Sequence, residues 1–254
     1  MNWATCIWCL QASSDTDREH IFPEALGCPP DLTLPGTDVC RQCNTSLAHL
    51  DRSVADEFDF VGLLRGIKRK RKRSPEIHSR GNVYGCLGMT GPELFFNLEP
   101  HPITLPNGKV VQPFRNKARD VRPAVKVHEK TMEMDFSLPF GQGKNFVRGI
   151  TKIAFNAFSF RSGSNLASAP TFNAVRSFVL HNMLQRRILL SYSPHRHVGL
   201  AIAGPWHRND DDYCIQVDIL GASFLVDLTP EETILKEVEE RLSANGSDGW
   251  TVLT

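Results

Sequence analysis

CIWC at residues 6–9 and CRQCN at residues 40–44 decide the fold of the N-terminal region, with REHIFPEALG at residues 18–27 between them. The two-residue spacing of each Cys-x-x-Cys pair lets both sulfurs reach one Zn²⁺ at about 2.3 Å. We therefore expect a structural zinc ion on four thiolates, those of Cys6, Cys9, Cys40 and Cys43. The metal would stabilise a segment too small to fold around an apolar core of its own.

Two structural disulfides or redox pairs are an alternative use of these four cysteines. Three further cysteines, Cys28, Cys86 and Cys214, make the total odd and have no partner nearby in the sequence. Residues 1–9 lack the basic start and long apolar stretch of a signal peptide. Both observations argue against a secreted disulfide framework, so we expect the three single thiols to be small buried side chains.

The chain has 254 residues, of which 41% are hydrophobic and 22% charged, as in a folded protein of one or two domains. Its net charge of +1 hides a segregation of charge along the sequence. Residues 1–60 carry a net charge of −7, residues 61–209 carry +17 and residues 210–254 carry −9. A basic block of this size is typical of proteins that meet phosphates, although a solvated basic linker would give part of the same pattern.

No run of about 18 apolar residues is present to span a bilayer. Together with the start of the chain, this favours a cytoplasmic protein without a membrane partner.

The N-terminal region combines three features: the two cysteine pairs, the Glu-His-Ile-x-Pro-Glu-Ala-Leu-Gly stretch between them and the Asn that follows the second pair. In this order they resemble the zinc-bound subgroup of HNH endonucleases, also called ββα-metal endonucleases. The resemblance covers about residues 3–60, and several elements agree in order and spacing. It implies an N-terminal zinc-stabilised ββα-metal finger, treble-clef-like, over residues 1–64. A basic linker at residues 65–81 and a mixed α+β domain with antiparallel strands at residues 82–254 would follow, giving an α+β protein.

A phosphodiester hydrolase needs a base that activates water and a cation that stabilises the leaving oxygen. Histidine suits the base because its ordinary pKa of about 6.5 leaves it partly neutral at pH 7. The resemblance assigns this role to His20. It also implies that Glu19 faces the opposite way and binds Mg²⁺ or Mn²⁺, and that the amide of Asn44 holds His20 in its working orientation.

The third residue of the cation site departs from the family pattern. Many relatives have His or Asn about nine residues after the central Asn, where this chain has Ser53, a poor ligand. Asp51 is the better candidate because seven residues are nearly two helical turns and return its carboxylate to the face of Asn44. His49 competes with it but would point well away on a helix. A third possibility is that neither Asp51 nor His49 is the ligand.

We expect a metal-dependent endonuclease that hydrolyses DNA. By resemblance, His20 activates water and a cation on Glu19 and Asp51 stabilises the leaving 3′ oxygen, which leaves 5′-phosphate products. The resemblance also suggests an effector of a prokaryotic antiviral defence system. The alternatives are an RNA-directed nuclease and a non-catalytic zinc-containing module that binds nucleic acid.

Six consecutive basic residues follow the N-terminal region: Lys68, Arg69, Lys70, Arg71, Lys72 and Arg73. Such a run would bind backbone phosphates through counterion release without reading sequence. A solvated linker and a localisation signal are the alternatives.

Hydrophobic periodicity predicts the remaining elements. We expect helices over residues 51–64, 146–158 and 172–183, with Lys144, Arg148 and Lys152 on the polar faces of the second. Short strands are expected at residues 83–87, 103–105, 109–112 and 125–128, and an antiparallel sheet from residues 188–192, 197–203, 213–220 and 222–228. A capping box, Thr229-Pro230-Glu231-Glu232, would open a last helix.

The role of residues 82–254 is open between substrate binding, homo-oligomerisation, contact with a partner protein and sensing. Three histidines, His195, His197 and His207, lie near an Asp run at residues 210–212. Their spacing fits no ligand pattern, so we interpret them as loop charges.

Overall fold

The computed structural model describes residues 4–67, 76–77, 81–113, 121, 123–135, 140–143, 145–192, 199–207, 212–245 and 249–254. The chain forms two compact units, Met1–Ala55 with Gly143–Thr254, and Asp56–Gln142. The N-terminal region thus shares a unit with the C-terminal part of the chain, a division that differs from the expected boundaries at residues 64 and 81. The basic run at residues 68–73 and the histidines at positions 195 and 197 lie outside the described residues.

Short antiparallel strand pairs build the N-terminal region. Its strands are β1 (Ala4–Thr5), β2 (Ala12–Ser13), β3 (Thr16–Asp17) and β4 (Val39–Cys40), and the pairs are β1 with β2 and β3 with β4. A 3₁₀ turn, η1 (Glu24–Leu26), lies between β3 and β4 in sequence. The mixed α+β class with antiparallel sheets is confirmed, but these two-residue pairs do not establish the ββα-metal finger that the resemblance implies.

Helix α1 (Arg41–Glu57) begins ten residues before the expected start at residue 51. Leu47, Leu50 and Val54 are buried at spacings of three and four residues, and the helix extends nearly three turns further toward the N-terminus than predicted. Cys43 and Asn44 therefore lie on the first turn of α1. The helix ends near Phe58, and the short α2 (Asp59–Leu64) follows.

Helix α3 (Phe146–Ser162) is the central helix of its unit and is buried on nearly every side. Trp8 packs on Phe155 of α3 in a T-shaped arrangement with ring centroids 5.0 Å apart, which joins the first cysteine turn to this helix. Shorter segments follow: α4 (Ser164–Ala167), η3 (Pro170–Phe172) and α5 (Asn173–His181). The predicted place of Lys152 on a polar face was wrong, because its side chain is 1% exposed.

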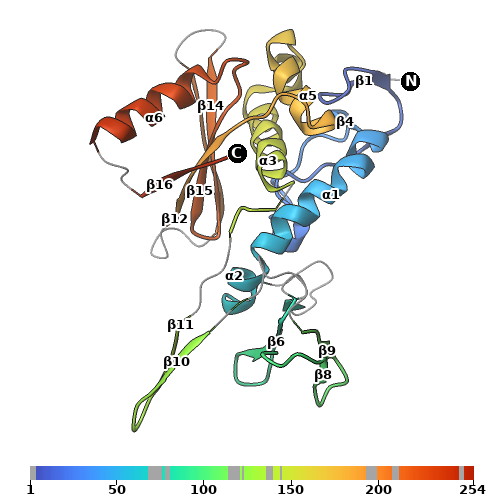
Figure 1. Ribbon diagram of the computed structural model, residues 1–254. Coiled ribbons are helices and arrows are strands. Elements are labelled where there is room, and N and C mark those ends of the chain that lie inside the picture. The colour runs from blue at the N-terminus through green and yellow to red at the C-terminus, as the bar shows by residue number, and fades with distance from the viewer. Residues whose placement is uncertain are drawn as a thin grey trace. The chain divides into compact units, whose positions relative to one another are not determined.

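A five-stranded antiparallel sheet completes this unit, in the order β13–β14–β15–β12–β16. Its strands are β12 (Ile188–Tyr192), β13 (Leu200–His207), β14 (Tyr213–Ile219), β15 (Ala222–Asp227) and β16 (Trp250–Leu253). The first four confirm the expected antiparallel strands, with β13 displaced toward the C-terminus and β16 not predicted. Figure 1 shows α3 and α6 (Thr233–Asn245) on opposite sides of the sheet, and Phe146 of α3 packs on Phe224 of β15.

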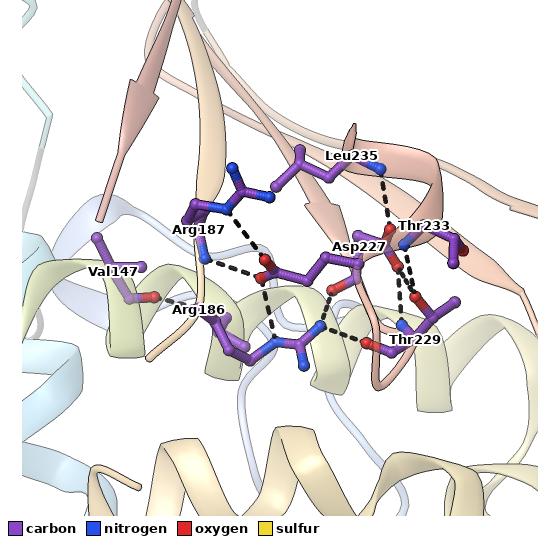
Figure 2. A network of polar contacts seen from close by, with 9 residues as sticks. Val147, Arg186, Arg187, Asp227, Thr229, Thr233 and Leu235 are labelled. Atoms are coloured by element: carbon purple, nitrogen blue, oxygen red, sulfur yellow. Dashed lines mark hydrogen bonds and ion pairs between the residues drawn. The ribbon is translucent and has the colours of Figure 1, made fainter. Parts of the chain in front are cut away.

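Asp227, at the end of β15, organises the start of α6 (Figure 2). Its Oδ1 accepts hydrogen bonds from the N–H and hydroxyl of Thr229, and its Oδ2 accepts one from the N–H of Leu235. The predicted capping box was wrong: Glu232 has a φ of 52° and its carboxylate binds Arg187 at 3.1 Å. Helix α6 begins at Thr233, and the carboxylate of Asp227 accepts the N–H of Thr229 that the box would have paired with Glu232.

The second unit contains α2 and three small antiparallel sheets. Its strands are β5 (Glu76–Ile77), β6 (Val83–Leu87), β7 (Pro92–Phe96), β8 (Ile103–Thr104), β9 (Val110–Val111), β10 (Ala124–Val127) and β11 (Met132–Asp135). β6, β8, β9 and β10 confirm the expected strands, whereas β5, β7 and β11 were not predicted. Among the described residues of the whole chain, no helix is long and apolar enough to cross a membrane.

Candidate functional site

Four cysteines from two separate turns converge in the N-terminal region. The sulfurs of Cys6, Cys9, Cys40 and Cys43 all lie within 4.8 Å of one another. The first pair lies in the turn between β1 and β2, where the N–H of Leu10 donates to the carbonyl of Cys6. The second pair lies where β4 passes into α1. The structure thus brings together the four residues that the sequence assigned to one metal ion.

The geometry of the cluster suits one tetrahedral ion. In a tetrahedral site with metal–sulfur distances of about 2.3 Å, neighbouring sulfurs are about 3.8 Å apart. The Sγ atoms of Cys9 and Cys40 are 3.8 Å apart, and the N–H of Cys43 donates to the Sγ of Cys40 at 3.4 Å. The contact between Cys6 and Cys43 lowers the pKa of Cys6 and raises the pKa of Cys43.

His20 lies in the segment between the two cysteine turns. It forms an antiparallel bridge with Thr33, and its Nε2 is 3.3 Å from Oε1 of Glu24, one turn further along the chain. The imidazole is 30% exposed. Its Nδ1 is buried and has no hydrogen-bond partner among the described residues, so Nε2 is the nitrogen that solvent or a substrate can reach.

Glu19, the neighbour of His20, is buried and turns inward. Its Oε1 lies 2.6 Å from Nζ of Lys152, and the amide nitrogen of Asn156 donates to the same oxygen at 3.1 Å. The N–H of Leu34 binds the backbone carbonyl of Glu19 at 2.8 Å. The carboxylate is therefore fixed against helix α3 rather than directed to solvent.

Asp51 of α1 meets the same ammonium. Nζ of Lys152 lies 2.7 Å from Oδ1 and 2.7 Å from Oδ2 of Asp51. Glu19 and Asp51 are thus brought together, as the sequence predicted for two ligands of one cation. The group between them, however, is a lysine from a helix a hundred residues further along the chain.

One face of α3 builds this contact. Gly149, Lys152 and Asn156 follow one another at spacings of three and four residues and share one side of the helix. Gly149 lies so close to α1 that a Cβ there would be 2.9 Å from the carbonyl oxygen of Leu50. This close approach of the two helices brings Lys152 to Asp51.

The charges of this cluster affect one another strongly. Burial alone would lower the pKa of Lys152, but the carboxylates of Asp51 and Glu19 outweigh it and raise the pKa, so the side chain remains an ammonium. Burial raises the pKa of Glu19, and the neighbouring charge of Asp51 adds to this effect although Lys152 opposes it. The ammonium is the charge that offsets the buried carboxylate of Glu19 and the partly exposed carboxylate of Asp51.

The pair fits a divalent cation poorly. Mg²⁺ prefers about six oxygen ligands at about 2.0–2.1 Å and keeps several of its waters. The point between Glu19 and Asp51 is filled by the nitrogen of Lys152. A shared ion needs three or more His, Cys, Asp or Glu side chains whose ligand atoms lie close together. Among the described residues the cysteine cluster forms such a group, and Glu19 and Asp51 do not belong to one.

The remaining candidates lie on α1 and make other contacts. The amide nitrogen of Asn44 is 3.5 Å from the carbonyl oxygen of Arg18, a long contact just before Glu19. His49 is exposed and its Nδ1 contacts the carbonyl of Ser46 at 2.8 Å, so it takes no part in the cluster around Lys152. Ser53, at the family's third position, is partly buried on α1.

A cavity of about 790 Å³ lies beside the cysteine cluster. It is lined by the first cysteine turn, by the start of α1 around Gln42 and by α5 around Arg176 and His181. The guanidinium of Arg176 is buried and donates to the carbonyl of Ala167 at 2.8 Å, which fixes the connection before α5. Glu19, His20, Asn44 and Asp51 do not line this cavity.

Sequence reasoning missed Lys152 and Asn156. Both lie in a helix with so many apolar residues that its few polar ones read as a solvated face. One signal was present: Gly149, Lys152 and Asn156 share a helical face within an otherwise apolar segment, which is where a buried polar contact is placed. What this face meets depends on long-range packing, which the sequence pattern does not give.

No protein-family model, curated protein or solved structure matches this chain significantly.

Proposed function

We propose that this protein is an endonuclease of the HNH type that hydrolyses phosphodiester bonds of DNA, with His20 as the general base. The observation that carries the proposal is the position of His20: a partly exposed imidazole in the segment that the two cysteine turns enclose. Glu19 and Asp51, two other residues of the motif, meet at Lys152, and the amide of Asn44 contacts the carbonyl of Arg18. A protein that only binds nucleic acid needs none of these residues in this arrangement.

In this proposal the four cysteines hold a structural Zn²⁺. Four sulfurs, three of them on buried residues, suit zinc better than a hard cation. The ion would tie the turn between β1 and β2 to the first turn of α1. The segment that carries His20 begins and ends at these two places, so the metal would fix the ends of the catalytic segment.

His20 would take the proton of the attacking water on Nε2. The oxygen of this water attacks phosphorus while the bond from phosphorus to the 3′ oxygen breaks, and the leaving oxygen receives a proton from solvent, which leaves a 5′-phosphate. The carboxylate of Glu24, 3.3 Å from Nε2, would stabilise the imidazolium that forms. Asn44 would help to order the backbone just before the motif through its contact with Arg18.

The resemblance also implies Mg²⁺ or Mn²⁺, which would supply charge stabilisation at the leaving oxygen. Glu19 and Asp51 do not fit this ion while Lys152 lies between them. The proposal therefore gives the divalent cation no ligands among these residues. Binding of the DNA backbone is assigned to the basic run at residues 68–73.

A non-catalytic zinc-containing module that binds nucleic acid is the second candidate. It is favoured by one observation: the two carboxylates expected to hold the catalytic cation both contact the ammonium of Lys152. Such a module would bind DNA or RNA with a strong salt dependence and would cleave neither.

Cleavage assays separate the two candidates. Purified protein would be incubated with supercoiled plasmid and with single-stranded RNA, each with Mg²⁺, Mn²⁺ or EDTA. His20→Ala is the test variant, and His49→Ala, which replaces an exposed histidine of α1 outside the cluster, is the matched control. Cleavage of plasmid by the wild type and by His49→Ala but not by His20→Ala supports the proposal. Binding without cleavage by all three supports the module, and cleavage of RNA alone supports an RNA-directed nuclease.

A further inference from the structure

The Lys152 ammonium has as many contacts as it has protons. It carries three N–H donors, and three carboxylate oxygens lie within 2.7 Å of it: Oε1 of Glu19 and both Oδ atoms of Asp51. The lysine side chain is 1% exposed and that of Glu19 is 4% exposed. Each N–H donor of the ammonium therefore has a carboxylate acceptor inside the protein, without a bound ion.

We infer that Lys152 is the built-in counter-ion of the Glu19–Asp51 carboxylate pair, and that this pair binds no divalent cation in the native protein. The inference stands on the geometry of these side chains and does not require the protein to be a nuclease. It also makes a positive claim. With the ammonium removed, the same two carboxylates would face each other across the space of a lysine side chain and would attract a divalent cation.

Two further features support a built-in cation over a lysine placed there by chance. Asn156, one turn along α3, donates to Glu19 at 3.1 Å and holds its carboxylate toward Lys152. Gly149, one turn the other way, permits the approach of α1 that brings Asp51 within reach. The contact of Lys152 with Asp51 joins residues 101 positions apart, and that of Asn156 with Glu19 joins residues 137 positions apart. Both contacts are made by one face of α3.

The pair consequently connects the N-terminal motif to the C-terminal part of its own compact unit. Leaving either carboxylate or the ammonium without its partner in this buried place is unfavourable, because an uncompensated buried charge costs much more than the intact pair contributes. Replacing all three charges by neutral groups of similar size removes that cost.

Lys152→Met tests the inference, because methionine has an unbranched chain of similar length without the charge. Zinc-loaded wild type and variant would be melted with and without millimolar Mn²⁺, and bound Mn²⁺ would be counted by electron paramagnetic resonance. We expect no Mn²⁺ bound to the carboxylates of the wild type and no shift of its melting temperature. The variant should melt on the order of 10 °C lower, bind one Mn²⁺ per chain and recover stability as Mn²⁺ is added.

The matched control is the triple variant Lys152→Met, Glu19→Gln, Asp51→Asn. It should melt above the single variant and show no response to Mn²⁺. If Lys152→Met does not fold, folding of the triple variant supports the inference and its failure to fold overturns it. The inference is also overturned if the wild type binds one Mn²⁺ that Glu19→Gln abolishes, or if folded Lys152→Met gains no site. None of these measurements uses nuclease activity, so they succeed or fail independently of the proposed function.

Discussion

Gly149 of α3 lies so close to Leu50 of α1 that a Cβ atom would be 2.9 Å from the Leu50 carbonyl oxygen and 2.5 Å from a methyl group of Val54. The carbonyl oxygen belongs to the helix backbone and cannot rotate away. Glycine at this position therefore sets how closely the two helices approach. Lys152 is one turn further along α3, so the same approach places its ammonium on Asp51.

Gly149→Ala should destabilise the protein despite the better helix propensity of alanine. Alanine gains about 1 kcal/mol in a helix interior, but overpacking against a fixed backbone costs typically about 1–3 kcal/mol. The separation of α1 and α3 should also weaken the contact of Lys152 with Asp51. We expect a lower free energy of unfolding, measured by urea denaturation followed by circular dichroism.

Gly62→Ala is the matched control for this substitution. Gly62 also lies in a helix, α2, and a Cβ there would meet nothing closer than Ile67 at 3.9 Å. This variant should be as stable as the wild type or more stable. Equal stability of Gly149→Ala and Gly62→Ala would contradict the close approach of α1 and α3.

Cys40→Ser should lose the metal and unfold the N-terminal region. Cys40 is buried, and its Sγ lies 3.8 Å from that of Cys9 and accepts the N–H of Cys43. Zinc content measured by mass spectrometry should fall from one ion per chain to near zero, and a chelator should unfold the wild type in the same way. Cys86→Ser, which replaces a half-buried cysteine outside the cluster, should keep its zinc. A wild type without zinc would overturn the metal site.

Cys214 should be unreactive in the folded protein. Burial raises the pKa of this thiol well above the usual range, and the neighbouring charge of Asp227 adds to the effect. The raised pKa keeps the group protonated at pH 8, and only the thiolate is a good nucleophile. Iodoacetamide should modify Cys214 only after denaturation, as shown by peptide mass spectrometry. Rapid labelling of Cys214 in native protein would contradict its buried place on β14.

The sequence was a good guide wherever the deciding interactions are local. The cysteine spacing predicted the cluster of four sulfurs, and alternation or helical periodicity predicted α3 and the strands β6, β12, β14 and β15. Local patterns failed where a distant group decides. Asp227 of β15, and not the Thr229–Glu232 box, prepares the start of α6.

The candidate site shows the same limit more sharply. The spacing placed Asp51 on the helical face of Asn44, the resemblance paired it with Glu19, and the structure brings the two carboxylates together. The sequence did not reveal that the positive charge between the two carboxylates is Lys152, because that contact depends on the packing of α3 against α1. An amphipathic pattern says which residues are polar, but a polar residue can face solvent or a buried partner.

The central claim is that His20 is the base of a DNA-cleaving site, and plasmid cleavage by the wild type and by His20→Ala tests it most directly. Conversion of supercoiled plasmid to nicked or linear forms would be measured over time at equal, zinc-loaded protein concentrations. We expect the wild type to cleave and His20→Ala to lose at least 100-fold in rate, since a positioned base contributes roughly 10²–10⁴-fold. Equal cleavage by the two proteins would contradict the account.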